Sequence, residues 1–99
     1  MSAFLLKPCK GSHGYQGITD HSLKLDLPKL RDHLLDQGFS EKLCVDIIMV
    51  MQRELVEYTI YPSGKFLIKP AVVQDEDIPL ETAEELANGL LRHFTEYLK

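Results

Sequence analysis

The sequence predicts a single α+β domain: a two-layer sandwich with a mainly antiparallel sheet of four or five strands and two helices on one face. Three observations lead to it. Residues 56–69 have the pattern of a β-hairpin, two stretches have apolar residues at helical spacing, and no change of composition divides the 99 residues. A chain of this length buries roughly two-thirds of its unfolded surface, which is enough for one core.

The hairpin is the clearest element, because β-branched and aromatic residues fill both of its arms. Pro62 sets φ for a type I turn, and Gly64 suits the left-handed position that closes such a turn with a bulge. The register that follows pairs Ile60 with Phe66, Thr59 with Leu67, Tyr58 with Ile68 and Glu57 with Lys69.

The first 38 residues predict a strand over residues 3–7, an irregular glycine-rich loop over residues 9–17 and a second strand over residues 23–27. A helix follows, with Asp26 as its N-cap, Pro28 in its first turn and Gly38 as its C-terminal cap. Its apolar stripe consists of Leu27, Leu30, Leu34 and Leu35.

Residues 42–51 fit either a helix or a strand, and their β-branched residues favour one strand that is covered on both sides. A turn near Gln52 and Arg53 would then lead into the hairpin. Alternation along this strand directs Val45, Ile47, Met49 and Met51 towards the helices and Cys44, Ile48 and Val50 away from them.

The last helix is expected to run to about residue 98, with Thr82 and Glu85 as a capping box. Gly89 in its interior predicts a close approach to a neighbouring element. The residues of its apolar stripe are Ala83, Leu86, Ala87, Leu90, Phe94 and Tyr97.

The composition narrows the classes of function. The net charge of −4 would repel a phosphate backbone, so we expect no nucleic-acid partner. No apolar run reaches the about 20 residues of a membrane span, so we expect no membrane association. The N-terminal residues do not resemble a signal peptide and the chain has two cysteines, which predicts reduced thiols in the cytoplasm.

One candidate site is a metal site in the glycine-rich loop. Cys9, His13 and His21 offer thiolate and imidazole ligands of the kinds that zinc prefers, with Asp20 beside them. Their spacing matches no established metal signature, and the alternative is an ordinary loop. The sequence indicates no particular cofactor.

Catalysis is not indicated. A nucleophilic Cys9 or Cys44 would need a histidine base, whereas His33 and His93 are expected on the exposed faces of the two helices. The sequence therefore favours a protein that is not an enzyme.

A second candidate site is the face of the sheet that the helices leave uncovered. Ile48, Val50, Tyr61 and Leu67 are expected to lie there and to bind a partner protein or a second copy of the chain, as in a homodimer. The alternative is that residues 8–22 cover this face.

Residues 57–69 and the last helix resemble a segment near the C-terminus of the adenylyltransferases that activate sulfur-carrier proteins. The resemblance lies in Thr59-Ile60-Tyr61, Ser63-Gly64-Lys65 and Leu67-Ile68-Lys69. The nucleotide-binding fold and paired zinc cysteines of that family are absent, so the resemblance implies an accessory role near carrier-protein chemistry and no adenylation.

These patterns lead to two functional hypotheses. The first is a small non-catalytic accessory or protein-interaction module that acts through the uncovered face of its sheet. The second is a small metal- or ligand-binding protein that uses the loop over residues 9–21.

Overall fold

The computed structural model describes residues 4–8, 14–19, 24–70 and 79–94. The predicted α+β class is confirmed, whereas the described sheet has six strands rather than the four or five expected. The elements are β1 Phe4–Pro8, β2 Tyr15–Thr19, α1 Leu27–Asp36, β3 Ser40–Val45, β4 Ile48–Arg53, β5 Val56–Ile60, β6 Phe66–Pro70 and α2 Leu80–Phe94.

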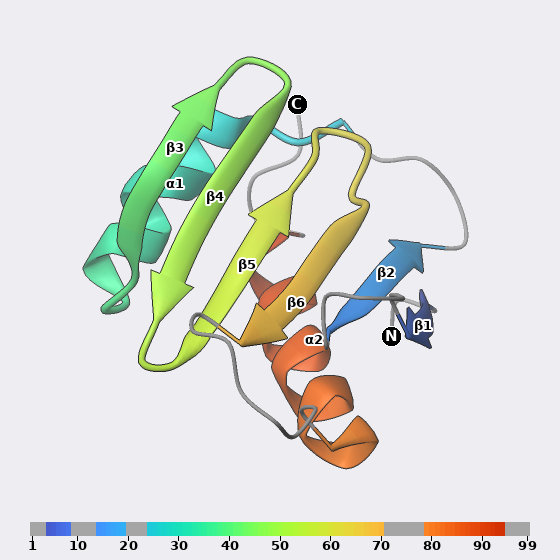
Figure 1. Ribbon diagram of the computed structural model, residues 1–99. Helices are drawn as coiled ribbons and strands as arrows, with labels where there is room; N and C mark the ends of the chain where they lie inside the picture. The colour runs from blue at the N-terminus through green and yellow to red at the C-terminus, as the bar shows by residue number, and fades with distance from the viewer. Residues whose placement is uncertain (1–3, 9–13, 20–23, 71–78, 95–99) are drawn as a thin grey trace.

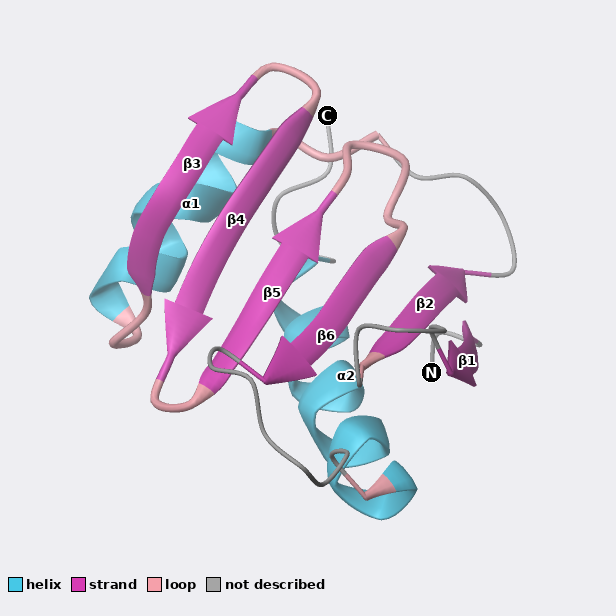
Figure 2. Cartoon of the chain, viewed as in Figure 1, coloured by secondary structure: helices cyan, strands magenta, loops and turns pink. Residues whose placement is uncertain are grey.

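The strands form one sheet in the order β1-β2-β6-β5-β4-β3, and all neighbours are antiparallel. Both helices lie on one side of it, behind the sheet in Figure 1. Figure 2 shows that β3 to β6 follow one another through short turns, whereas the β1–β2 hairpin is added beside β6. That junction has three residue pairs, compared with five between β5 and β6.

The β5–β6 hairpin has the predicted register, from Ile60 opposite Phe66 to Glu57 opposite Lys69. Gly64 has a φ of +96°. Its amide donates to the Tyr61 carbonyl over 3.0 Å, and the Tyr61 amide donates to the Lys65 carbonyl over 2.9 Å. The glycine therefore closes the turn as expected, because a left-handed φ is costly for other residues.

The single strand predicted for residues 42–51 is wrong. The segment folds as two strands, β3 and β4, with a tight turn at Asp46 and Ile47. The next turn is at residues 54–55, where Glu54 has a φ of +56°, and not at Gln52 and Arg53. Apolar density was a poor guide here, because Ile47 lies in the turn with 72% of its surface exposed.

The second strand predicted over residues 23–27 is wrong for its described part, because residues 24–27 contain only a single bridge residue, Leu25, before α1 begins. The described second strand, β2, begins at Tyr15, inside the loop that was expected to be irregular. Gly17 makes this strand possible: a Cβ at this position would lie 2.1–2.5 Å from the Phe66 ring. Leu25 is buried outside any long strand, and its amide donates to the Pro62 carbonyl over 2.9 Å.

Helix α1 has the predicted caps. The Asp26 carboxylate accepts from the Lys29 amide over 3.3 Å, and Gly38 has a φ of +93° beyond the last turn. The Phe39 amide donates to the Leu34 carbonyl over 3.0 Å, which completes the Schellman motif. Leu35, expected in the apolar stripe, is exposed.

Helix α2 begins at Leu80, two residues before the predicted cap Thr82, and its described part ends at Phe94. Ala83, Ala87, Leu90 and Phe94 are buried as expected. The expected close approach at Gly89 is not found among the described residues, because a Cβ there would meet none of their atoms within 4 Å.

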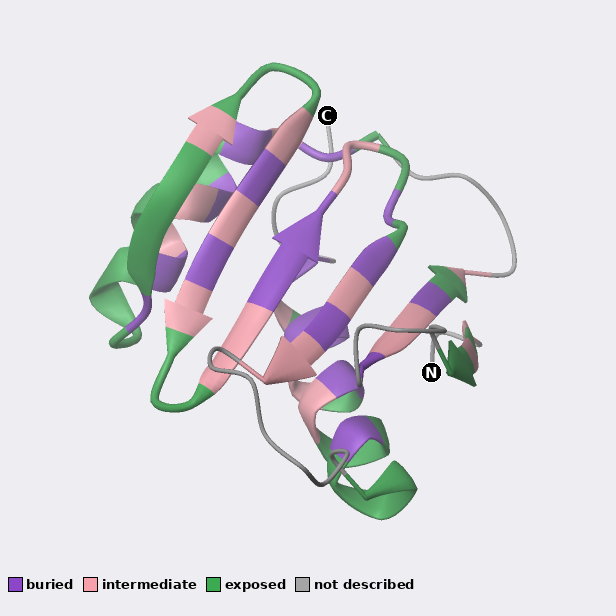
Figure 3. Cartoon of the chain, in the orientation of Figure 1, coloured by how far each residue is buried: buried purple, intermediate pink, exposed green. Residues whose placement is uncertain are grey.

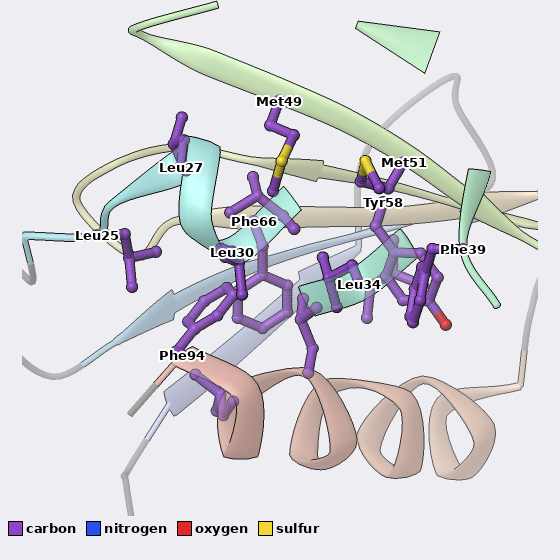
Figure 4. Close-up of a cluster of buried hydrophobic side chains, with 14 of the residues drawn as sticks. Leu25, Leu27, Leu30, Leu34, Phe39, Met49, Met51, Tyr58, Phe66 and Phe94 are labelled. Atoms are coloured by element: carbon purple, nitrogen blue, oxygen red, sulfur yellow. The ribbon is translucent and has the colours of Figure 1, made fainter. Parts of the chain in front are cut away.

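The core lies between the sheet and the two helices (Figure 4). The rings of Phe66 and Phe94 join β6 to α2 edge-on, with centroids 6.1 Å apart. Apolar side chains from every second position of the strands meet the buried stripes of α1 and α2: Leu27, Leu30, Leu34, Met49, Met51, Tyr58, Ile60, Phe66, Ile68, Ala87, Leu90, Leu91 and Phe94.

Candidate interaction surface

The side of the sheet opposite the helices carries a second set of apolar residues. Because side chains alternate along a strand, each residue next to a core position faces this side. We define the open face as Leu43, Val45, Ile48, Val50, Thr59, Tyr61 and Leu67. Figure 3 views the sheet from this side, and no described helix lies in front of it.

The strand register aligns four of these residues in a row across β3, β4, β5 and β6. Leu43 pairs with Val50, Val50 with Thr59, and Thr59 with Leu67. Thr59, in the middle, is buried between its two neighbours, whereas Leu43 at the edge is 44% exposed. The row is therefore buried at its centre and accessible at its β3 end.

The four residues predicted to bind a partner all belong to this face. Ile48, Val50 and Leu67 are half-buried and lie outside the hydrophobic core. Tyr61 follows the core residue Ile60, and the Lys65 ammonium lies 5.4 Å from the centroid of its ring.

Two residues of β3 have the opposite orientation to the one expected. Cys44 pairs with Met49 and packs against the core, and Val45 is 46% exposed. The turn at Asp46 and Ile47 explains the reversal, because it breaks the alternation that a single strand would have continued from β4.

Glu57 lies next to the apolar row and is paired with two lysines. Its carboxylate is 3.0 Å from the Lys42 ammonium of β3 and 3.4 Å from that of Lys69 on β6. Burial raises the pKa of Glu57, but the Lys42 hydrogen bond and the charges of both lysines together bring that pKa below its ordinary value of 4.5. The group therefore keeps its charge in the folded protein and ties three strands together.

Both edges of the sheet carry features that discourage pairing with another strand. The described edge strand β1 has only five residues and ends in Lys7 and Pro8. The other edge, β3, has a bulge between Glu41 and Leu43 that contains Lys42. Lysine, proline and bulges are typical protections of exposed edges, so the open face is more suited to association than either edge.

The chemical sites considered from the sequence gain no structural support. Cys9, His13 and His21 lie outside the described residues, so the metal site in that loop stays a prediction. Among residues 4–8, 14–19, 24–70 and 79–94, no three His, Cys, Asp or Glu side chains come together as metal ligands.

Cys44 is not an activated thiol. Burial raises the pKa of the Cys44 thiol above its ordinary value and outweighs the opposite effect of the nearby Arg31 guanidinium. A thiol that stays protonated is a poor nucleophile.

The sequence reasoning missed one contact. His33 and His93 were expected on exposed helix faces, but both are half-buried and touch each other between α1 and α2. The signal in the sequence is weak: each histidine stands directly before a buried residue, Leu34 or Phe94, on the border of an apolar stripe.

Comparison with known proteins adds no relationship. No family model, no curated protein and no solved structure matches this chain. The resemblance of residues 57–69 to the adenylyltransferase segment therefore stays a prediction. Neither described helix has the length and apolarity needed to span a membrane.

Proposed function

We propose that this protein is a small non-catalytic interaction domain that binds a second copy of itself through the open face. The observation that carries the proposal is the row of Leu43, Val50, Thr59 and Leu67, which crosses four strands on the side without a described helix. Apolar surface of this kind is typical of association sites.

The arrangement of the row favours a second copy over an unrelated partner. Its two ends, Leu43 and Leu67, are both leucine, so a two-fold axis near its centre would set the β3 end of one copy against the β6 end of the other. Such an isologous contact needs only one self-complementary surface. The neighbouring Lys42, Glu57 and Lys69 bring both signs of charge, which allows the same face to meet itself.

The size of the sheet sets the expected strength. Strands about 4.8 Å apart and roughly 17 Å long give the open face, from β3 to β6, an extent of about 14 Å by 17 Å. This is smaller than a standard specific interface, which buries about 800 Å² per partner. We therefore expect a weak dimer that depends on protein concentration.

The test compares two leucines with nearly equal exposed fractions on opposite sides of the molecule. Leu43 on the open face is 44% exposed, and Leu35 on α1 is 43% exposed. Leu43→Lys should weaken the dimer by at least about tenfold, because it leaves a charge without a partner in the contact. Leu35→Lys should dimerise like the wild type.

Sedimentation equilibrium from micromolar to millimolar protein measures the dimer dissociation constants of the wild type and of both variants. Circular dichroism verifies that each variant is folded. A wild type that stays monomeric at millimolar concentration contradicts the proposal. So does a folded Leu43→Lys variant that dimerises as tightly as the wild type.

A further inference from the structure

The helix layer contains a histidine pair that joins distant parts of the chain. His33 on α1 and His93 on α2 are 60 residues apart in sequence, and the distance between His33 Nε2 and His93 Nδ1 is 2.8 Å. The ring centroids are 4.7 Å apart, and the planes are tilted by 58°. In each helix the residue that follows the histidine, Leu34 or Phe94, is fully buried.

In this contact a ring nitrogen of His33 and a ring nitrogen of His93 face each other. At 2.8 Å it is an N–H···N hydrogen bond, in which one imidazole donates and the other accepts. A single proton thus lies between two groups that are both good ligands for transition metals. If this proton moved to the other nitrogen of the donor ring, a cation in its place would meet both lone pairs at once.

We propose that His33 and His93 form a binding site for a divalent transition metal ion such as zinc. Zinc binds imidazole nitrogen at about 2.0–2.1 Å, so two ligands in a tetrahedral site are about 3.3 Å apart. The nitrogens at 2.8 Å need to separate by only about 0.5 Å, which small rotations of the side chains provide. Imidazole also suits copper and nickel, and zinc accepts the most varied geometry.

The number of ligands sets the strength and the effect of the site. No third His, Cys, Asp or Glu joins the pair among the described residues. The affinity should therefore be below that of a structural zinc site with four protein ligands. Because the two ligands belong to different helices, bound metal would fasten α1 to α2 and stabilise the folded state alone. The site is independent of the open face, which lies on the opposite side of the sheet.

The experiment separates this site from the loop site predicted from the sequence. The starting protein is the full chain with Cys9→Ser, His13→Gln and His21→Gln, which removes the loop ligands. We would titrate this protein with Zn²⁺ alone and monitor the titration by calorimetry and by NMR of the histidine rings. Calorimetry should show one bound ion, and NMR should show shifts of the His33 and His93 signals. Zinc should also raise the melting temperature.

His33→Gln and His93→Gln, each in the same background, should lose at least about tenfold in zinc affinity, because a single imidazole remains. They should also lose the increase in melting temperature. Unchanged zinc affinity in both folded variants overturns the proposal. If a variant does not fold, the ring signals of the starting protein still decide: no shift of His33 and His93 at millimolar zinc overturns the site.

Discussion

The two faces of the sheet use alternating residues of the same strands, yet they have different surroundings. On β6, Phe66 and Ile68 are fully buried under the helices, whereas Leu67 between them is half-buried on the open face. All three are large apolar residues. The difference shows that cover from other elements decides burial here, and two helices cover only one side of a sheet.

The largest expected effect comes from truncating two neighbouring residues that lie on opposite faces of the sheet. Phe66→Ala should lower the free energy of unfolding by about 3–5 kcal/mol, because it leaves a cavity among packed side chains. Leu67→Ala should cost about 1 kcal/mol in the monomer, since part of its side chain is already in contact with water. Urea denaturation at low protein concentration measures both. Equal losses would mean that the open face is as well covered as the core.

A second test adds volume to the helix-covered side. Gly17→Ala should destabilise the fold by about 1–3 kcal/mol, because the new methyl group would collide with the Phe66 ring. Gly89→Ala is the matched control: its Cβ meets nothing within 4 Å, and a helix interior favours alanine by about 1 kcal/mol. The two variants should therefore move the thermal midpoint in opposite directions. A neutral Gly17→Ala would show that β2 does not pack against Phe66.

The smallest effect concerns the charges beside the open face. The pKa of Glu57 is lowered on folding, so its contribution to stability is complete above the ordinary value of 4.5 and is lost as the pH falls through the folded pKa. Glu57→Gln should therefore cost up to about 1 kcal/mol at neutral pH and progressively less as the pH falls below 4.5. Stability measured by urea denaturation across this pH range provides the comparison.

The lysines supply the control for this pH dependence. Lys42→Met combined with Lys69→Met removes both cations near Glu57. This double variant should lose the same acid-dependent part of the stability as Glu57→Gln. If it keeps the wild-type pH dependence, the two lysines do not lower the pKa of Glu57.

The sequence was most informative where several local signals agreed. In the β5–β6 hairpin, the turn residues Pro62 and Gly64, the apolar alternation and the Glu57–Lys69 pair all select the observed register. Residues 40–53 carried only apolar density, which two short strands and one long strand satisfy equally. The turn at Asp46 and Ile47 contains neither glycine nor proline, and Asp46 alone is a weak turn signal.

Contacts between distant residues were less predictable. The open-face residues Ile48, Val50 and Leu67 followed from alternation within strands, which is a local property. The His33–His93 contact depends on how α1 and α2 lie together on the sheet, and no spacing within either helix contains that information. Gly17 is similar, because its need for glycine arises from Phe66, which is distant in sequence.

The short junction between β2 and β6 has a consequence for the order of assembly. Strands β3 to β6 join near neighbours in the chain, so closing them costs little entropy, whereas β2 must find β6 across roughly fifty residues. Three residue pairs then secure the contact. We therefore expect the N-terminal hairpin to be the last part of the sheet to dock during folding and the first to separate, which leaves β6 as an unprotected edge until the hairpin docks.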